Sequence, residues 1–467
     1  MTELIPESPP SSDTDLHLLH LKSLFGQPIG LWIAALTEFW VAAATYGMQA
    51  ILLFYMQRIV LHPETIPHIF GATALIKLSN FLYHPPSFTG MAAAIMGMYL
   101  AALFAMPLLG AFFSDYFLGR NRAIILGFLL ATAGLITLAS PSLFVVSILL
   151  FLIGTGFVGC LKAQVGSLYS ETDRRRSDAY QIYSLSIQIA VMFSPLLTSW
   201  VSETSWKYAF LLCAVGMSFA GLTYILGLKY LPAAPAITHK KKGALSSPKF
   251  TRLEKKNIAL ICVIMLLFAI SAIPNMELND GYLIWAEQAY NLQILNYNFP
   301  VSDLYSLDGM ISTITAVLVL WFWQSYDKHQ KPMGDMGKIL IGTFIGSIGP
   351  LVLAYVSFIY PQPHQISLWW GILFHTINDF GFAMSTMIGL SLVSRLTPKS
   401  IATIMISFFW LHICLCNIIV GKLASLIETM SAVTFWLLHS GLSFIGFIGL
   451  LCIAIFCKNL LPKEKTA

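Results

Sequence analysis

Twelve apolar runs, each about 20 residues or longer, limit what this 467-residue chain can fold into. A helix of about 20 mostly apolar residues is long enough to cross the hydrocarbon core of a bilayer. Hydrophobic residues make up 57% of the chain and charged residues only 10%, whereas soluble domains have about 25% charged residues. The predicted spans cover residues 30–57, 90–113, 121–140, 143–168, 178–201, 206–231, 256–279, 305–325, 337–360, 366–395, 399–425 and 432–457. We therefore expect an all-α membrane protein with twelve transmembrane helices.

The basic residues indicate which way the chain crosses the membrane. Cytoplasmic loops carry an excess of Lys and Arg. With the N-terminus inside, 22 of the 27 Lys and Arg residues fall in cytoplasmic segments and 4 in outer segments. Both termini are therefore expected in the cytoplasm, and the net charge of +5 needs no nucleic-acid partner. Residues 1–25 lack the basic start of a secretory signal.

A Pro-, Ser- and Lys-rich segment, "LPAAPAITHKKKGALSSPKFTRLEKK", lies between the sixth and seventh predicted spans. Its composition is typical of a solvated linker, here residues 232–255. The linker separates two predicted six-helix bundles, with cytoplasmic tails at both ends of the chain. The predicted bundles are 30–231 and 256–457, and the tails are 1–29 and 458–467. This layout is that of major facilitator transporters, whose substrate site lies between the bundles, although a channel or membrane enzyme could share the helix count.

Motifs of enzymes and metal proteins are absent from the sequence. There is no Walker loop, no zinc-ligand spacing and no Gly-x-Ser-x-Gly. All seven cysteines fall within predicted spans, which argues against a disulfide framework or a metal site. We therefore expect neither enzymatic activity nor a cofactor.

The segment "GQPIGLWIAALTEFWVAAATYGMQAILLFYM" (26–56) resembles the first helix of the proton-dependent oligopeptide transporters, a family of the major facilitator superfamily. Five further segments are similar to that family, in the same order along the chain: "LLGAFFSDYFLGRNRAI" (108–124), "IYSLSIQIAVMFSPLL" (182–197), "FPVSDLYSLDGM" (299–310), "GLSLVSRLTP" (389–398) and "SFFWLHICLCNIIVG" (407–421). The resemblance implies a major facilitator fold and secondary active transport by alternating access. It also implies peptides or amino-acid derivatives as substrates. The basic inner loops and the lack of a sorting signal favour a bacterial inner membrane or a plasma membrane as the location.

Several positions depart from the pattern of the family. Its first helix typically reads Glu-x-x-Glu-Arg, but here only the first acid, Glu38, is kept, and Val41 and Ala42 follow. Gln49 stands where the family has an arginine, and Phe382 stands at the glutamate that usually receives the amino group of a peptide. The resemblance therefore predicts weak or absent activity on ordinary short peptides.

Two opposite charges are expected at similar depth in the first bundle. Glu38 lies about 8 residues into the first span and Lys162 about 7 residues from the cytoplasmic end of the fourth. With a rise of 1.5 Å per residue, both lie roughly 10–12 Å deep. Intramembrane charges need a partner, so we predict a Glu38–Lys162 ion pair, similar to a contact of the family. Alternatively, Lys162 extends to the interface and Glu38 is protonated or hydrogen-bonded.

The tenth span carries a polar stripe on one helical face. His375, Asn378, Asp379, Phe382 and Thr386 recur at helical spacing, interrupted only by the phenylalanine. His375 and Asp379 are four residues apart and could pair. Such a pair could carry a proton, because imidazole titrates near pH 6.5. A buried packing contact without function is the alternative.

Other polar residues in the spans are further candidates for substrate binding or coupling. Tyr46 matches a family tyrosine that faces the substrate, and Gln188 stands where the family has an asparagine. Glu277 falls within one position of a family cavity glutamine, or else is simply solvated at the end of its helix. His412 and His439 are lone intramembrane histidines, which we expect to be packing residues.

The loop after the second span resembles the general facilitator motif. Its residues are Gly110, Asp115, Gly119 and Arg120. In such a motif an acid near a helix start and an arginine latch the cytoplasmic ends of the two halves. A purely structural tight turn at Gly119 is the alternative.

These expectations describe a secondary transporter of a small organic solute, with protons as the candidate coupling ion. Its partners would be the substrate and the lipid bilayer, and we expect a monomer. Two other functions remain open. The chain could be a non-transporting receptor or scaffold derived from a transporter, or an uncoupled facilitator or exporter of a neutral solute.

Overall fold

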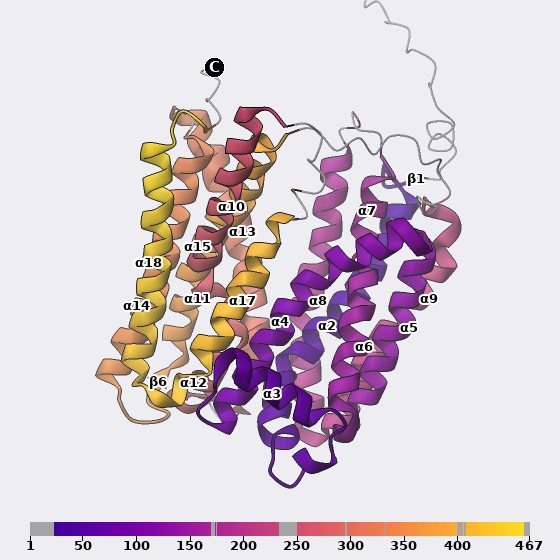
Figure 1. Ribbon diagram of the computed structural model, residues 1–467, viewed down its shortest axis with the longest axis vertical. Coiled ribbons are helices and arrows are strands. Elements are labelled where there is room, and N and C mark those ends of the chain that lie inside the picture. The colour runs from indigo at the N-terminus through magenta and orange to yellow at the C-terminus, as the bar shows by residue number, and fades with distance from the viewer. Residues whose placement is uncertain are drawn as a thin grey trace, which may run out of the picture.

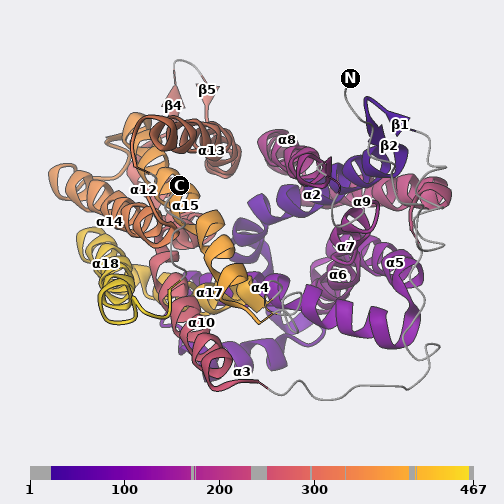
Figure 2. The same cartoon turned by 90° about the horizontal axis from the view of Figure 1, so that it is seen from above.

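The computed structural model is built almost entirely of helices, which gather into two groups (Figures 1 and 2). It describes residues 23–169, 173, 175–232, 250–294, 297–331, 333–398, 405 and 408–461. Most of the predicted linker, most of both predicted tails and the start of the eleventh predicted span lie outside these residues.

The first group of helices corresponds to the first six predicted spans. A short hairpin, β1 (Ser23–Leu24) and β2 (Gln27–Pro28), leads into α2 (Ile29–Tyr55), which continues as the π-helix η1 (Met56–Val60). The other elements are η2 (Ile66–His68), α3 (Ala72–Tyr83), α4 (Phe88–Phe113), η3 (Ser114–Leu118), α5 (Arg120–Leu138), η4 (Pro141–Leu143), α6 (Phe144–Val158), α7 (Leu161–Gly166), α8 (Arg175–Thr204), α9 (Trp206–Gly227) and η5 (Leu228–Tyr230).

The second group corresponds to the last six predicted spans. Its elements are α10 (Arg252–Ser271), α11 (Ile273–Met276), η7 (Glu277–Asn279), α12 (Gly281–Ala289), η8 (Val301–Asp303), α13 (Leu304–His329), α14 (Asp335–Ile359), α15 (Leu368–Leu396), α17 (Leu411–Ala424), η10 (Ile427–Thr429) and α18 (Ala432–Phe456). Two-residue strands join the loops: β3 (Tyr290–Asn291) pairs with β6 (Ile366–Ser367), and β4 (Gln293–Ile294) with β5 (Tyr297–Asn298).

The helices bear out the predicted fold class. Among the described residues, ten helices are long and apolar enough to cross a membrane, and the bent pair α10 and α11–η7 makes an eleventh span. The 29-residue helix α15 occupies the position of the tenth predicted span. Its polar residues, including His375 and Asp379, lower its mean hydropathy. The arrangement matches the expected two six-helix bundles of a major facilitator fold.

A break in the seventh span places several polar residues deep in the second bundle. The axis bends by 50° between α10 and α11–η7. Pro274 lies in the first turn of α11, where it lacks an N–H and its ring would clash with the carbonyl of Ile270 in a continuous helix. The chain therefore turns at Ala272, and the residues that follow point in new directions.

The two bundles touch at the end of the molecule that carries α3 and α12 (Figure 1). A Cβ atom on Gly97 of α4 would lie 2.3 Å from the Cα of Gly421 on α17, so the two backbones are in direct contact there. Nearer the same end, Lys422 donates a hydrogen bond to the carbonyl of Tyr83. Arg58 and Glu287 form an ion pair between the bundles, with both side chains partly exposed. By the predicted topology, this is the outer end.

Candidate functional site

Gln49 on α2 reaches across the boundary between the bundles. It is 4% exposed, and its Nε2 donates hydrogen bonds to the hydroxyl of Tyr305 on α13 and to Oδ1 of Asn279, the latter at 3.5 Å. Tyr46, on the preceding turn of α2, is half-buried. Polar groups of the first and last six spans therefore meet at the boundary between the bundles.

Gln188 makes a second polar contact between the bundles. Its Nε2 donates to Oγ1 of Thr313 at 3.2 Å, which joins α8 to α13. One turn further toward the outer end, Gly309 packs against Val191, where a Cβ atom would lie 2.7 Å from Cγ1 of the valine. The sequence prediction that Gln188 belongs to the site is compatible with this position.

The predicted Glu38–Lys162 ion pair is not formed. Glu38 is 9% exposed, and its Oε2 accepts a hydrogen bond of 2.5 Å from the hydroxyl of Tyr183 on α8. Lys162 is exposed on α7, and no ion pair of it occurs in the described part of the chain. The helix of the fourth span is interrupted at Gly159 and Cys160, just before Lys162. Equal depth therefore does not bring the two charges together.

The predicted His375–Asp379 pair is also wrong. Nδ1 of His375 lies 2.8 Å from Oδ1 of Asp308 on α13, and Nε2 lies 2.9 Å from the hydroxyl of Tyr282 on α12. Both ring nitrogens are thus occupied by residues of other helices. The histidine is 1% exposed, whereas 26% of the Asp308 side chain remains exposed. Sequence reasoning missed Asp308, although an acid within a predicted span is a signal in itself.

Asp379 bonds to the seventh span instead. Its Oδ1 accepts a hydrogen bond from Nδ2 of Asn275 at 3.3 Å, and its Oδ2 is buried without a hydrogen-bond partner. The carboxylate is 3% exposed. The hydrogen-bond partner of Asp379 therefore lies on the seventh span and not on its own helix.

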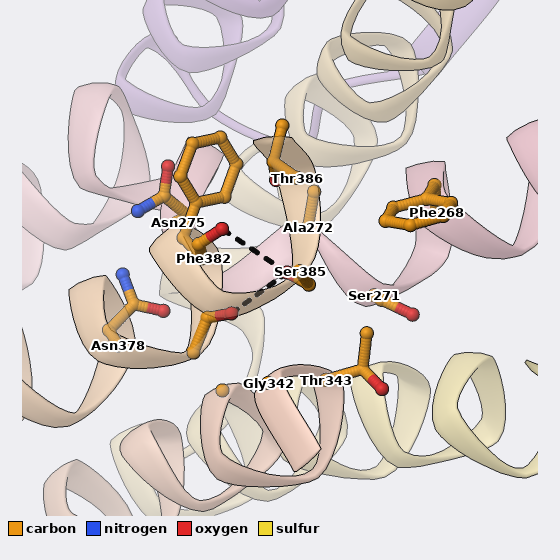
Figure 3. Close-up of a pocket in the computed structure, with 12 residues that line it drawn as sticks. Phe268, Ser271, Ala272, Asn275, Gly342, Thr343, Asn378, Phe382, Ser385 and Thr386 are labelled. Carbon is orange, nitrogen blue, oxygen red and sulfur yellow. Dashed lines mark hydrogen bonds between the residues drawn. The ribbon is translucent and has the colours of Figure 1, made fainter. Parts of the chain in front are cut away.

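A small cavity lies within the second bundle (Figure 3). Asn275, Asn378 and Phe382 are among its lining residues, with α10 and α14 contributing others. It leaves about 10 Å³ for the centre of a water molecule, which is room for about one water. The buried Nδ2 of Asn378 has no hydrogen-bond partner and could bind such a water. Phe382 is half-buried and packs with the apolar cluster of α10, α11 and α17.

Glu277 is neither solvated nor alone. It is fully buried, and its Oε2 lies 2.9 Å from Nε2 of His439 on α18. Nδ1 of His439 contacts the carbonyl of Phe435 at 2.7 Å, and a carbonyl can only accept, so Nδ1 carries a proton. A second proton must then lie between Nε2 and Glu277. His439 is therefore not the simple packing residue that the sequence suggested, whereas the only hydrogen-bond partner of His412 among the described residues is the carbonyl of Phe409.

The loop after the second span forms a tight turn at Gly119, which was the structural alternative to a latch. Gly119 has a φ of 76°, a conformation that favours glycine, and it connects η3 to α5. Gly110 packs directly against the backbone of Gly156, so a Cβ atom would not fit. Nη1 of Arg120 donates to Oγ of Ser167 at 3.1 Å within the same bundle, and Asp115 is exposed. The structure thus shows the turn, and a latch between the halves remains a prediction.

Comparison with known proteins gives matches along most of the chain. The profile described as Major Facilitator Superfamily matches residues 50–421. A di-/tripeptide transporter of Lactococcus lactis is 34% identical over 218 residues, which cover 45% of this chain and 40% of that protein. The uncharacterized transporter YclF of Bacillus subtilis is 23% identical over 490 residues, which cover 93% of both chains.

Solved structures share the fold at low sequence identity. A crystal structure of a peptide transporter, POT, in complex with sulfate has a TM-score of 0.83 and is 20% identical, with 97% of this chain and 100% of that chain covered. A POT family transporter in complex with 5-aminolevulinic acid has a TM-score of 0.77 and is 21% identical. The match between the two covers 95% of this chain and 99% of that transporter.

Proposed function

Because this chain belongs to the major facilitator superfamily, we propose that it is a secondary active transporter of small organic solutes and, from its similarity to peptide transporters, a member of the POT family. Peptides and amino-acid derivatives are the default substrate class. The two halves, 30–231 and 256–457, would move as units about the 232–255 linker. We place both termini in the cytoplasm and the chain, as a monomer, in the cell inner membrane.

This proposal rests on the position of the contacts between the two bundles. The backbone contact of Gly97 with Gly421 and the Arg58–Glu287 ion pair lie toward the end with α3 and α12. Gln49 and Gln188 bring polar groups to the boundary between the bundles. Contacts grouped at one end fit a state that is closed on the outer side, as alternating access requires. Asp115 and Arg120 would then latch the halves when the inner side closes.

Purified protein in proteoliposomes tests the proposal directly. Uptake of Ala-Ala, amino acids and nucleosides would be measured with and without an imposed pH gradient, and liposomes without protein would be the control. We expect exchange of at least one solute, with Ala-Ala a poor substrate because Ala42 and Phe382 lack the charges that a short peptide needs. Each lost charged hydrogen bond weakens binding by about 1.5–3 kcal/mol, roughly tenfold or more.

Two results would contradict parts of this proposal. Strong proton-driven accumulation of Ala-Ala would show that the site handles ordinary peptides. Failure to exchange any solute, together with specific binding of one, would favour a non-transporting receptor.

Proton coupling, if it exists, would involve the Asp308–His375 contact. His375→Gln keeps a polar side chain but cannot gain a proton near neutral pH. We expect the variant to lose accumulation driven by a pH gradient, with the ratio of inner to outer solute falling to about one. Solute exchange without a gradient should persist. Asp327→Asn is the matched control, because Asp327 pairs with Lys338 far from this contact. Unchanged accumulation by His375→Gln would exclude this route.

A further inference from the structure

The helix α3 connects the first two spans, and one of its sides packs against the protein. Ala72, Ser79 and Tyr83 are buried, and Leu75 is half-buried against the main apolar cluster. With 3.6 residues per turn, these four positions lie on the same side of the helix. The protein therefore covers only part of the circumference of α3.

The rest of the circumference is divided into a polar stripe and an apolar stripe. The polar stripe consists of exposed residues at helical spacing: Thr73, Lys77 and Asn80. The apolar stripe has the same spacing and is also exposed: Ala74, Leu78, Phe81 and Leu82. Leu78, Phe81 and Leu82 are 46%, 77% and 50% exposed. Contact with water alone would not separate the two classes of side chain, so the two stripes face different surroundings.

The helix α3 lies at the level of the membrane surface. The first span ends at Val60, and the second begins at Phe88, shortly after α3 ends at Tyr83. Figures 1 and 2 place α3 at the edge of the molecule, at its outer end. Phe88 is itself 55% exposed at the start of a span, so lipid reaches the protein next to α3.

Both ends of α3 are fixed to the protein. Before the helix, the N–H of Phe70 donates to the carbonyl of Ser142 at 2.9 Å, within the first bundle. At its end, the carbonyl of Tyr83 accepts the hydrogen bond of Lys422 on α17, and a Cβ atom on Gly421 would lie 3.5 Å from Cζ of Tyr83. The helix thus reaches from the first bundle to the second, beside the backbone contact that closes the outer end.

We propose that α3 is an interfacial helix, that its apolar stripe inserts into the outer leaflet, and that this insertion holds Tyr83 against α17 in the closed state. Such helices bury an apolar face about 5–10 Å into the boundary between headgroups and acyl chains. Each side of α3 then has a matching surrounding: protein, water with headgroups, or acyl chains. Lipid is the partner, rather than another protein, because it already adjoins Phe88 without any assembly step.

Nitroxide labels on a genetically encoded keto amino acid test insertion of the full chain in lipid nanodiscs, and they leave the native cysteines unmodified. Leu78 and Phe81 represent the apolar stripe, and Lys77 and Asn80 the polar stripe. We expect labels at Leu78 and Phe81 to collide more often with oxygen, which concentrates among acyl chains, than with a water-soluble nickel chelate. Labels at Lys77 and Asn80 should show the reverse order.

Two results would overturn the insertion of α3. More frequent collisions with the nickel chelate at all four positions would show that the apolar stripe faces water. Few collisions with either reagent at Leu78 and Phe81 would show that protein covers the stripe. Spin dilution with unlabelled chain would then identify a second copy as that cover. These measurements need no transported solute, so a failure of transport would not affect them.

Phe81→Lys tests whether insertion supports closure, and Asn80→Lys on the polar stripe is the matched control. Nitroxides at His62 and Asn291, exposed residues at the outer ends of the two bundles, report the distance between them. We expect Phe81→Lys to raise the population with the longer distance by roughly fivefold or more, because lysine disfavours the inserted state. Asn80→Lys should leave the distances unchanged. Leu82→Lys is the second variant if Phe81→Lys does not fold, and unchanged distances in the apolar-stripe variants would overturn the role of α3 in closure.

Discussion

Replacing His439 with leucine is expected to lower the free energy of unfolding by about 3–5 kcal/mol, because it leaves Glu277 buried and unpaired. Glu277, Asp280 and His439 are all fully buried. Both oxygens of Asp280 and Oε1 of Glu277 already lack hydrogen-bond partners, so the imidazole is the main compensation for this group. Unfolding in detergent, followed by denaturant titration, measures the loss.

His412→Leu is the matched control for this prediction. His412 is also fully buried in a span, but its Nε2 has no partner and no acid contacts it among the described residues. The same substitution there should cost less than about 1.5 kcal/mol. Adding Glu277→Gln to His439→Leu should recover part of the stability, since it removes the unpaired charge. Equal losses in the free energy of unfolding for His439→Leu and His412→Leu would show that the burial of Glu277 does not depend on the imidazole of His439.

Substituting Gly97 with leucine is expected to open the outer end of the protein. The new Cβ atom would lie 2.3 Å from Cα and 2.8 Å from the backbone nitrogen of Gly421, and backbone atoms cannot rotate away. This steric clash can be relieved only if α4 and α17 move apart. Overpacking costs about 1–3 kcal/mol, which shifts the balance between closed and open outer ends by roughly 5- to 150-fold. Distances between spin labels at positions 58 and 287 would report the opening.

Gly441→Leu on α18 controls for the substitution itself. A Cβ atom at Gly441 has no heavy atom within 4 Å, so the added side chain meets open space. The distances between labels should then match those of the unmodified protein, and solute exchange should persist. An unchanged distance distribution in Gly97→Leu would mean that the bundles do not need this contact to close.

The sequence was sufficient to predict the helices, but it was not sufficient to predict which residues contact their polar side chains. Hydropathy defines spans that the helices match, because lipid forces every crossing segment to satisfy its own backbone hydrogen bonds. Depth alone did not predict the partner of Glu38. A pairing also depends on the direction in which each side chain points around its helix, and Lys162 is exposed whereas Glu38 is buried against Tyr183.

The candidate site shows the same limit. His375 and Asp379 share a helical face, which made a local pair reasonable, yet tertiary packing brought Asp308 and Tyr282 to the imidazole first. Pairs between separate helices, such as Glu277 with His439, carry no spacing signal along the chain. The acid at Asp308 was visible in the sequence, and its cost in a membrane was reason enough to consider it.

The break at Pro274 also has a mechanical consequence for the seventh span. A continuous helix transmits tilt along its whole length, but here the backbone hydrogen bonding is interrupted between α10 and α11. The inner segment can therefore lean during gating while the outer segment stays fixed to α18 through Glu277 and His439. Gating movements on the cytoplasmic side would be isolated from the acids of the seventh span, so the geometry of these charges would persist throughout the transport cycle.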